Sequence, residues 1–297
     1  MLDRSKLLTE CRLLESMELD RLGAVAAVEL MNAADATAVE AVAAAAADVA
    51  AAVELAAAAF ARGGRLIYVG AGTSGRLGVL DAAECPPTFS TDPSMVQGII
   101  AGGDAAMFRA VEMAEDQAPD GAAAIDARGV DDRDVVMGIA AGGTTPFVHG
   151  ALARARELGA RTVFLTCVEK FAGEPVVDVV IRALTGPEVL TGSTRLKAGT
   201  ATKLVLNQIT TIAMARLGKV YENLMVDLRL NNAKLWDRGA RIVAMLTGLD
   251  KESAMRHLVE ADGSVKTAVV MHKKQIAKPE AENLLNRCDG NLRRALG

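Results

Sequence analysis

Short, continuous apolar runs recur between residues 63 and 185, and segments of helical composition separate them. A run of this length, bounded by glycine or polar residues, is typical of a strand buried on both faces of a parallel sheet. Two separating segments, Asp104–Asp116 and Pro146–Leu158, have the composition of helices. The alternation predicts an α/β fold, a doubly wound parallel sheet of about five strands. The predicted strands are Arg65–Gly70, Met95–Ala101, Asp134–Ala141, Arg161–Cys167 and Val176–Arg182.

The two ends of the chain have helical patterns. Alanine-rich sequence runs from Asp35, a predicted helix N-cap, to Arg62, where Gly63-Gly64 is a stop signal. After Thr185 the predicted helices are Thr194–Leu217, Val220–Leu246 and shorter ones punctuated by Gly248, Gly263 and Pro279. We therefore expect a helical arm (1–62), an α/β domain (63–218) and a C-terminal helical region (219–297).

Composition and charge exclude several classes of protein. Of the 297 residues, 51% are hydrophobic and the formal net charge is −4, which is too apolar for a disordered chain. Lysine and arginine are scattered, so no nucleic-acid partner is expected. The most apolar stretch, Ala41–Phe60, carries Asp48 and Glu54 and is expected to be a helix of the fold and not a membrane span.

Cysteine and histidine are sparse and widely separated. The four cysteines have no C-x-x-C spacing and the three histidines are dispersed, so we expect neither disulfides nor a metal site. The first residues are too charged for a signal peptide. These features predict a cytoplasmic protein with reduced thiols.

The loop after the first predicted strand, Gly70–Arg76, matches the dinucleotide pattern G-x-G-x-x-G. The match is incomplete, because Cys85-Pro86-Pro87 is expected to end the following helix early. The backbone of Gly72 and the hydroxyls of Thr73 and Ser74 at a helix N-terminus suit a phosphate monoester better than a pyrophosphate.

Two further polar loops also place glycine and hydroxyl residues ahead of a predicted helix. One is formed by Gly142, Gly143, Thr144 and Thr145, ahead of Pro146, and the other contains Ser193, Thr194 and Lys197. Each alone reads as an ordinary turn with a helix cap. Because carboxyl ends of parallel strands meet at one edge, all three loops together predict a shared anion site.

Carboxylates supply the candidate acid and base. Glu84 precedes two prolines in an apolar neighbourhood, and a turn of that kind is expected to raise its pKa toward that of a general acid. Glu112 and Glu115 are spaced to share one face of the helix predicted over Asp104–Asp116. Spacing alone does not choose between these two.

Long motifs in the chain resemble those of N-acetylmuramic acid 6-phosphate etherases, which are sugar-isomerase-type (SIS) domain proteins related to the glucokinase regulatory protein. The resemblance covers nearly the whole chain. The matching stretches are Gly64–Phe89, Ile100–Gly103, Ala110–Asp116, Thr191–Thr200, Lys203–Asn207 and Gly218–Asp227.

The resemblance implies a lyase that removes D-lactate from C3 of the sugar by elimination and then adds water, with no metal or redox cofactor. It implies that Glu84 is the proton donor and Glu115 the second acid/base group. It also implies a phosphorylated amino sugar as substrate and a homodimer with sites near the interface.

The chain departs from the family pattern at the third-strand loop. The family's loop usually reads Ala-Ser-Gly-Arg-Thr-Pro, whereas Ala141–Pro146 has glycine and threonine in place of the serine and the arginine. The N-terminal motif Thr-Glu-x-Arg-Asn-Pro is partly kept, as Thr9–Leu14. Two alternatives therefore stay open: a non-catalytic sugar-phosphate-binding regulator, and a lyase or isomerase acting on another sugar phosphate.

Overall fold

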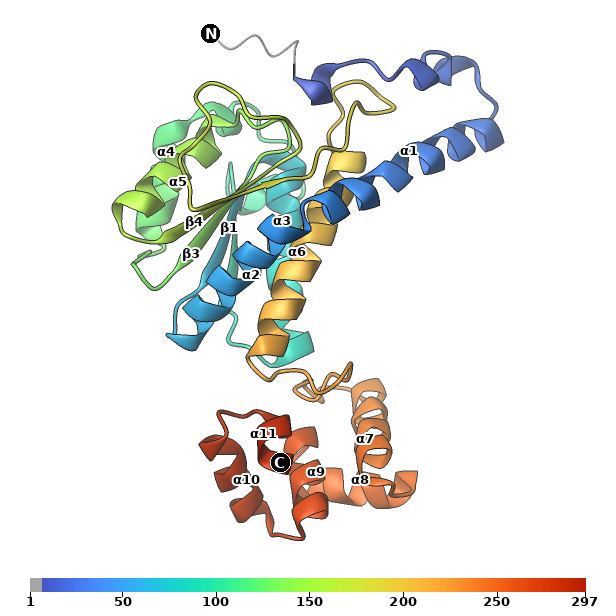
Figure 1. The fold of residues 1–297 in the computed structure, drawn as a ribbon, viewed down its shortest axis with the longest axis vertical. Helices are drawn as coiled ribbons and strands as arrows, with labels where there is room; N and C mark the ends of the chain where they lie inside the picture. Colours follow the sequence, from blue (N-terminus) through green and yellow to red (C-terminus); the bar gives the residue numbers. More distant parts are fainter. Residues whose placement is uncertain (1–6) are drawn as a thin grey trace. The chain divides into compact units, whose positions relative to one another are not determined.

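The computed structural model describes residues 7–297. At its centre is a five-stranded sheet with the strand order β2-β1-β3-β4-β5, and all neighbouring strands are parallel (Figure 1). The strands are β1 (Leu66–Gly70), β2 (Val96–Ile100), β3 (Val135–Ile139), β4 (Arg161–Thr166) and β5 (Val179–Arg182). The predicted doubly wound α/β fold is confirmed.

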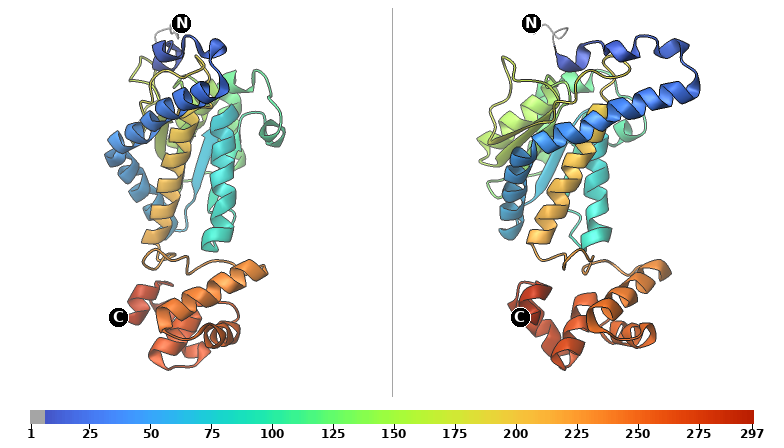
Figure 2. Two further views of the ribbon diagram at one scale, coloured as in Figure 1. Left: turned by 90° about the vertical axis from the view of Figure 1, so that its right-hand side faces the viewer. Right: turned by 45° about the vertical axis from the view of Figure 1, so that its right-hand side comes forward.

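Helices lie on both faces of the sheet. One face is covered by α4 (Ala118–Ala127) and α5 (Pro146–Glu157), and the other by α2 (Ala46–Ala61), α3 (Gly72–Phe89) and α6 (Lys197–Arg216) (Figures 1 and 2). Glycine allows α3 to come close, because a Cβ on Gly78 would lie 2.8 Å from the Cβ of Tyr68 on β1. The buried carboxylate of Asp81 on α3 accepts hydrogen bonds from Tyr68 and from Lys203 on α6, each 3.0 Å long.

The N-terminal arm differs from its predicted form. The helix α1 (Ala24–Ala44) begins before Asp35, so the predicted N-cap at Asp35 is wrong. Earlier described residues form 3-10 turns at Leu8–Glu10, Leu14–Ser16 and Leu19–Arg21, and the part of the predicted helical arm before Leu7 lies outside the described residues. In residues 7–297 no single helix has the length and hydropathy to cross a membrane; α1 and α2 meet those two criteria only as a pair, which is bent by 61°.

The chain divides into two compact units. One contains the chain up to Ala83 together with Ser94–Thr210, and the other contains Glu84–Pro93 with Thr211–Gly297. The second unit has its own apolar core, in which Val243, Leu258 and Val269 are fully buried. Its helices are α7 (Ala233–Thr247), α8 (Lys251–Glu260), α9 (Val265–Lys274), α10 (Lys278–Arg287) and α11 (Leu292–Leu296).

The helix predicted over Val220–Leu246 begins only at Ala233, which corrects its first half. Tyr221 and Leu224 pair across a tight turn, and Glu222 between them has a left-handed φ of 54°. The side chain of Asn232 then accepts a hydrogen bond from the backbone N–H of Leu235, which is the usual way to start a helix.

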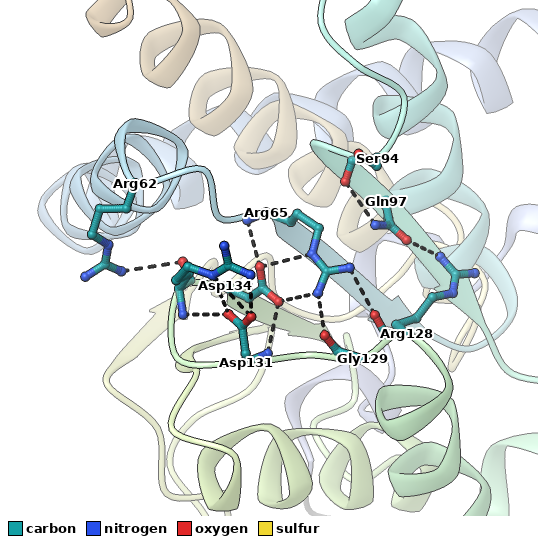
Figure 3. Close-up of polar contacts among 9 residues, drawn as sticks. Arg62, Arg65, Ser94, Gln97, Arg128, Gly129, Asp131 and Asp134 are labelled. Atoms are coloured by element: carbon teal, nitrogen blue, oxygen red, sulfur yellow. Dashed lines mark hydrogen bonds and ion pairs between the residues drawn. The ribbon is translucent and has the colours of Figure 1, made fainter.

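A polar cluster ties the starts of β1 and β3 together (Figure 3). The carboxylate of Asp134 is 2% exposed and accepts hydrogen bonds from the backbone N–H of Arg65 at 2.8 Å and from its guanidinium at 2.5 Å. The guanidinium of Arg65 also donates to the carbonyl oxygens of Arg128 and Gly129. The hydrogen bond to Asp134 raises the pKa of Arg65.

We expect Asp134→Ala to lower the free energy of unfolding by about 3 kcal/mol, because it leaves a half-buried guanidinium and a backbone N–H without their acceptor. Denaturant unfolding followed by circular dichroism measures this. The control is Asp131→Ala, which removes a carboxylate that is 39% exposed and pairs with Arg133. A loss of stability in the Asp131 variant equal to that in the Asp134 variant would contradict the assignment.

Candidate functional site

The strand order reverses beside β1. The chain leaves β1 to form β2 on one side and later returns to form β3 on the other. In open α/β sheets, ligands bind in the crevice beyond the carboxyl ends of the strands at such a reversal. The loops after β1 and β3 border this crevice, and they are two of the three polar loops predicted to bind an anion.

The first loop makes a very tight turn from β1 into α3. A Cβ on Gly75 would lie 2.7 Å from the carbonyl oxygen of Gly70, so the backbone needs glycine there. Gly72 has a φ of +51° and starts the helix. Thr73 and Ser74 follow in the first turn and are half-buried. Backbone N–H groups and two hydroxyls are thus available at the N-terminus of α3.

The second loop joins β3 to α5. Gly143 has a φ of +77° and packs so closely on Phe171 that a Cβ would lie 2.7 Å from its ring. Thr145 is the N-cap residue of α5, but its side chain makes no capping hydrogen bond. Thr144 is half-buried beside it. Both hydroxyls are therefore available to a ligand at a helix N-terminus.

The third loop leads into α6 and is held by a buried carboxylate that the sequence did not single out. Glu188 is 0% exposed and accepts hydrogen bonds from the backbone N–H groups of Lys197 and Ala198, each 3.0 Å long. The side chain of Lys197 is itself buried, with Nζ 3.5 Å from Thr37 on α1. Lys197 was predicted as a phosphate ligand, and its ammonium lies against the helical arm.

One contact links the first predicted loop to the first turn of α6. A Cβ on Gly199 of α6 would lie 3.6 Å from both the side chain of Thr73 and the carbonyl oxygen of Thr194. The N-terminal 3-10 turn reaches the other two loops. A Cβ on Gly142 would lie 3.8 Å from Thr9 Oγ1, and a Cβ on Gly192, next to Ser193, would lie 3.2 Å from a carboxylate oxygen of Glu10.

Glu115 lines a pocket of about 220 Å³ beside the first loop. The pocket also holds Gly72, Arg76 and Glu112. Arg76 sits half-buried on α3 and donates a hydrogen bond of 3.1 Å to the carbonyl oxygen of Met107. Both candidate bases, Glu112 and Glu115, therefore line a pocket close to the N-terminus of α3.

The helix predicted over Asp104–Asp116 is wrong. The segment forms 3-10 turns at Asp104–Met107 and Ala114–Asp116. Gly102 and Gly103 start it at positive φ, and Met113 has a left-handed φ of 63°, which no helix accommodates. Residues held in sparsely populated backbone conformations cluster at functional sites.

Glu84 also differs from its predicted surroundings. The helix α3 does not end at Cys85 but continues to Phe89, because the backbone N–H of Ser90 still bonds to the carbonyl oxygen of Pro86 at 3.0 Å. Glu84 is thus an exposed residue in a helix and not a residue of an apolar turn. Because α3 is not cut short at Cys85, its length no longer argues against a dinucleotide-binding site.

Two other kinds of catalysis, by a cysteine nucleophile and by a bound metal ion, have little support in the described residues. Burial raises the pKa of the Cys167 thiol to about 12, and the nearby Glu188 carboxylate adds to the shift. A thiol of that kind stays protonated at neutral pH and is a poor nucleophile. Within residues 7–297 no three or more His, Cys, Asp or Glu side chains are grouped so that they could hold a metal ion.

Comparison with known proteins identifies the class and then the family. Residues 48–156 match the family model described as the glucokinase regulatory protein N-terminal SIS domain, and residues 222–278 match the C-terminal lid domain of glucokinase regulatory protein. The chain is thus a SIS-domain protein with a lid-type domain.

Curated relatives match almost the full length of the chain. It is 52% identical to a protein of Crocosphaera subtropica and 54% identical to one of Synechococcus elongatus and one of Nostoc sp., each over 99% of this chain and 96% of the relative. Each of these relatives is named N-acetylmuramic acid 6-phosphate etherase. The chain belongs to the N-acetylmuramic acid 6-phosphate etherase family.

Proposed function

We propose that this protein is a carbon–oxygen lyase that cleaves the D-lactyl ether of N-acetylmuramic acid 6-phosphate and releases N-acetylglucosamine 6-phosphate and D-lactate. One observation carries the proposal: relatives that bear this activity in their name are 52% to 54% identical to the chain over 99% of its length. The three hydroxyl-rich loops at the sheet edge support a phosphate monoester in the substrate. A phosphorylated substrate also fits the expected cytoplasmic location.

The reaction needs two proton transfers at neighbouring carbons. In the open-chain sugar, the C2 proton is acidic because it lies alpha to the C1 aldehyde. A base removes it, the electron pair forms the C2–C3 double bond, and the C3–O bond breaks toward the lactate oxygen, which takes a proton from an acid. Water then adds to C3 and a proton returns to C2, so one water is consumed for each ether cleaved.

The phosphate is assigned to the three loops. The proposed ligands are neutral donors at the N-termini of α3, α5 and α6. They are Gly72, Thr73, Ser74, Gly142, Gly143, Thr144, Thr145, Ser193 and Thr194. Helix N-termini attract a phosphate dianion, and hydroxyls can donate to its oxygens. Lys197 is proposed to act indirectly, by holding α1 beside the start of α6.

Glu115 is proposed to handle the C2 proton. Its pocket also contains Gly72, so a sugar whose phosphate lies on the first loop has its carbon chain within reach of the carboxylate. The family motif and the pocket both support Glu115, while the pocket alone leaves Glu112 open.

Glu84 is proposed to be the acid and to come from a second copy of the chain. The family resemblance implies a homodimer with sites near the interface, and Glu84 is exposed on α3. The exposed valines 25, 28 and 39 of α1 offer apolar surface for a contact between two copies.

A non-catalytic sugar-phosphate regulator is the second candidate. It is supported by the glucokinase regulatory protein models that match the chain and by the altered loop Ala141–Pro146. The distinguishing observation is turnover, because a regulator would bind the phosphorylated sugar without releasing lactate.

Incubation with N-acetylmuramic acid 6-phosphate should release D-lactate, which a D-lactate dehydrogenase assay detects. The 6-hydroxy sugar should release very little, because the loop donors then have no dianion to hold. Tight binding of the 6-phosphate without lactate would support the regulator, and equal turnover of both sugars would contradict the anion site.

Exchange of the C2 proton with deuterated water separates the two pocket carboxylates. Glu115→Gln should reduce exchange by about 10²–10⁴-fold, because a general base is lost. The matched control, Glu112→Gln, should keep most of the exchange. Mass spectrometry of the recovered sugar measures both. Normal exchange in the Glu115 variant with loss in the Glu112 variant would move the role to Glu112.

Mixed dimers test the origin of Glu84. Glu84→Gln and Glu115→Gln are each expected to be nearly inactive. When the two subunits are mixed at random, half of the dimers combine them and each has one intact site of two, so about a quarter of the wild-type activity should return. If one chain supplies both glutamates, the mixture should stay as inactive as its components.

A further inference from the structure

The N-terminal 3-10 turn Leu8–Glu10 contains a buried hydroxyl whose partner is missing from the described part of the chain. Thr9 is 0% exposed, and its Oγ1 makes no hydrogen bond with any residue from 7 to 297. Thr185, in the same unit, also has a buried hydroxyl without a partner, whereas the hydroxyls of Thr202 and Thr210 donate to carbonyl oxygens one turn earlier in α6. A buried hydroxyl without a partner is a cost to the fold, and a ligand that accepts its hydrogen bond removes that cost.

The hydroxyl of Thr9 faces the loop between β3 and α5. A Cβ on Gly142 would lie 3.8 Å from Thr9 Oγ1, so the glycine leaves open the space next to the hydroxyl. Thr144 and Thr145 follow in this loop, and the hydroxyl of Thr145 is not used for capping α5. The orphaned hydroxyl thus lies beside the loop that leads into the N-terminus of α5.

The charges near Thr9 determine which part of a ligand can bind beside it. Glu10, the next residue, holds its carboxylate near Gly192 of the third loop, 3.2 Å from the position of a Cβ. A phosphate dianion is repelled from that carboxylate and is favoured at the N-terminus of α5, on the side of Thr9. Uncharged sugar hydroxyls, which can donate to Glu10, suit the other side.

We propose that Thr9 is a direct phosphate ligand: its hydroxyl donates to a phosphate oxygen of the bound sugar phosphate and supplies the side-chain donor that Gly142 lacks. The N-terminal turn is then a part of the binding site that covers the β3–α5 loop. This inference rests on the proposed sugar-phosphate specificity, but it concerns binding and does not depend on ether cleavage.

The test compares Thr9→Val with the wild-type protein by calorimetry, with N-acetylglucosamine 6-phosphate and N-acetylglucosamine as probes. Valine keeps the shape and removes the hydroxyl. We expect affinity for the 6-phosphate to fall about tenfold and affinity for the unphosphorylated sugar to stay the same. The melting temperature should not fall, because no hydrogen bond to the described protein is lost. Thr210→Val is the control and should leave both affinities unchanged.

A second variant restores the donor from the other side. Gly142→Ser in the Thr9→Val background places a hydroxyl beside the vacated position and should recover most of the lost affinity. An unchanged affinity in Thr9→Val, an equal loss for both sugars, or no wild-type preference for the 6-phosphate would each overturn the proposal. Wild-type binding without lactate release would instead count against the proposed lyase and leave the Thr9 comparison decisive.

Discussion

The close approach of α3 to the end of β1 is the constraint on which the rest of the site depends. The first turn of the helix comes so near the strand that a Cβ on Gly75 would lie 2.7 Å from the carbonyl oxygen of Gly70. Such a turn aims the N-terminus of α3 over the sheet edge, beside the reversal of strand order. The pocket with Glu115 also contains Gly72 at the start of that helix, so the proposed base lies beside the anion loop.

Neutral donors dominate the loop edge. The ammonium of Lys197 lies 3.5 Å from the Thr37 hydroxyl on α1, and threonine stands at position 144, where the family's pattern has arginine. A dianion held by hydroxyls and backbone N–H groups is bound through short directional contacts and not through net charge. Binding of that kind depends on exact loop geometry. Glu188 supports it by fixing the start of α6 with two hydrogen bonds, and the N-terminal turn supports it by packing on two loops.

The sequence predicted the sheet well because its strands are buried on both faces and are therefore continuously apolar. β1 and β3 show it most clearly, as every residue in them is buried. The first two loops could be predicted because glycine and hydroxyl residues follow β1 and β3 directly. The local sequence pattern gave a wrong prediction at two places where the backbone conformation decides the structure. Two prolines are accommodated in the last turn of α3. Met113, in a left-handed conformation, interrupts a segment of helical composition.

Side-chain contacts that link separate loops and helices could not be predicted from local sequence. Glu188 binds the start of α6 from a preceding loop, and Thr9 meets Gly142 across more than a hundred residues of chain. No spacing rule connects such positions, because the fold alone brings them together. The roles of Glu84 and Glu115 stay predictions that rest on family motifs, since their chemistry depends on a substrate and on a second copy.

Turnover in ¹⁸O-labelled water tests the central claim most directly. If lactate leaves by elimination and water adds to the double bond, the new oxygen belongs to the sugar. Mass spectrometry should therefore find one ¹⁸O at C3 of N-acetylglucosamine 6-phosphate and none in the hydroxyl of D-lactate. Label in the lactate hydroxyl would mean that the bond on the other side of the ether oxygen breaks, and that result would contradict the proposed lyase mechanism.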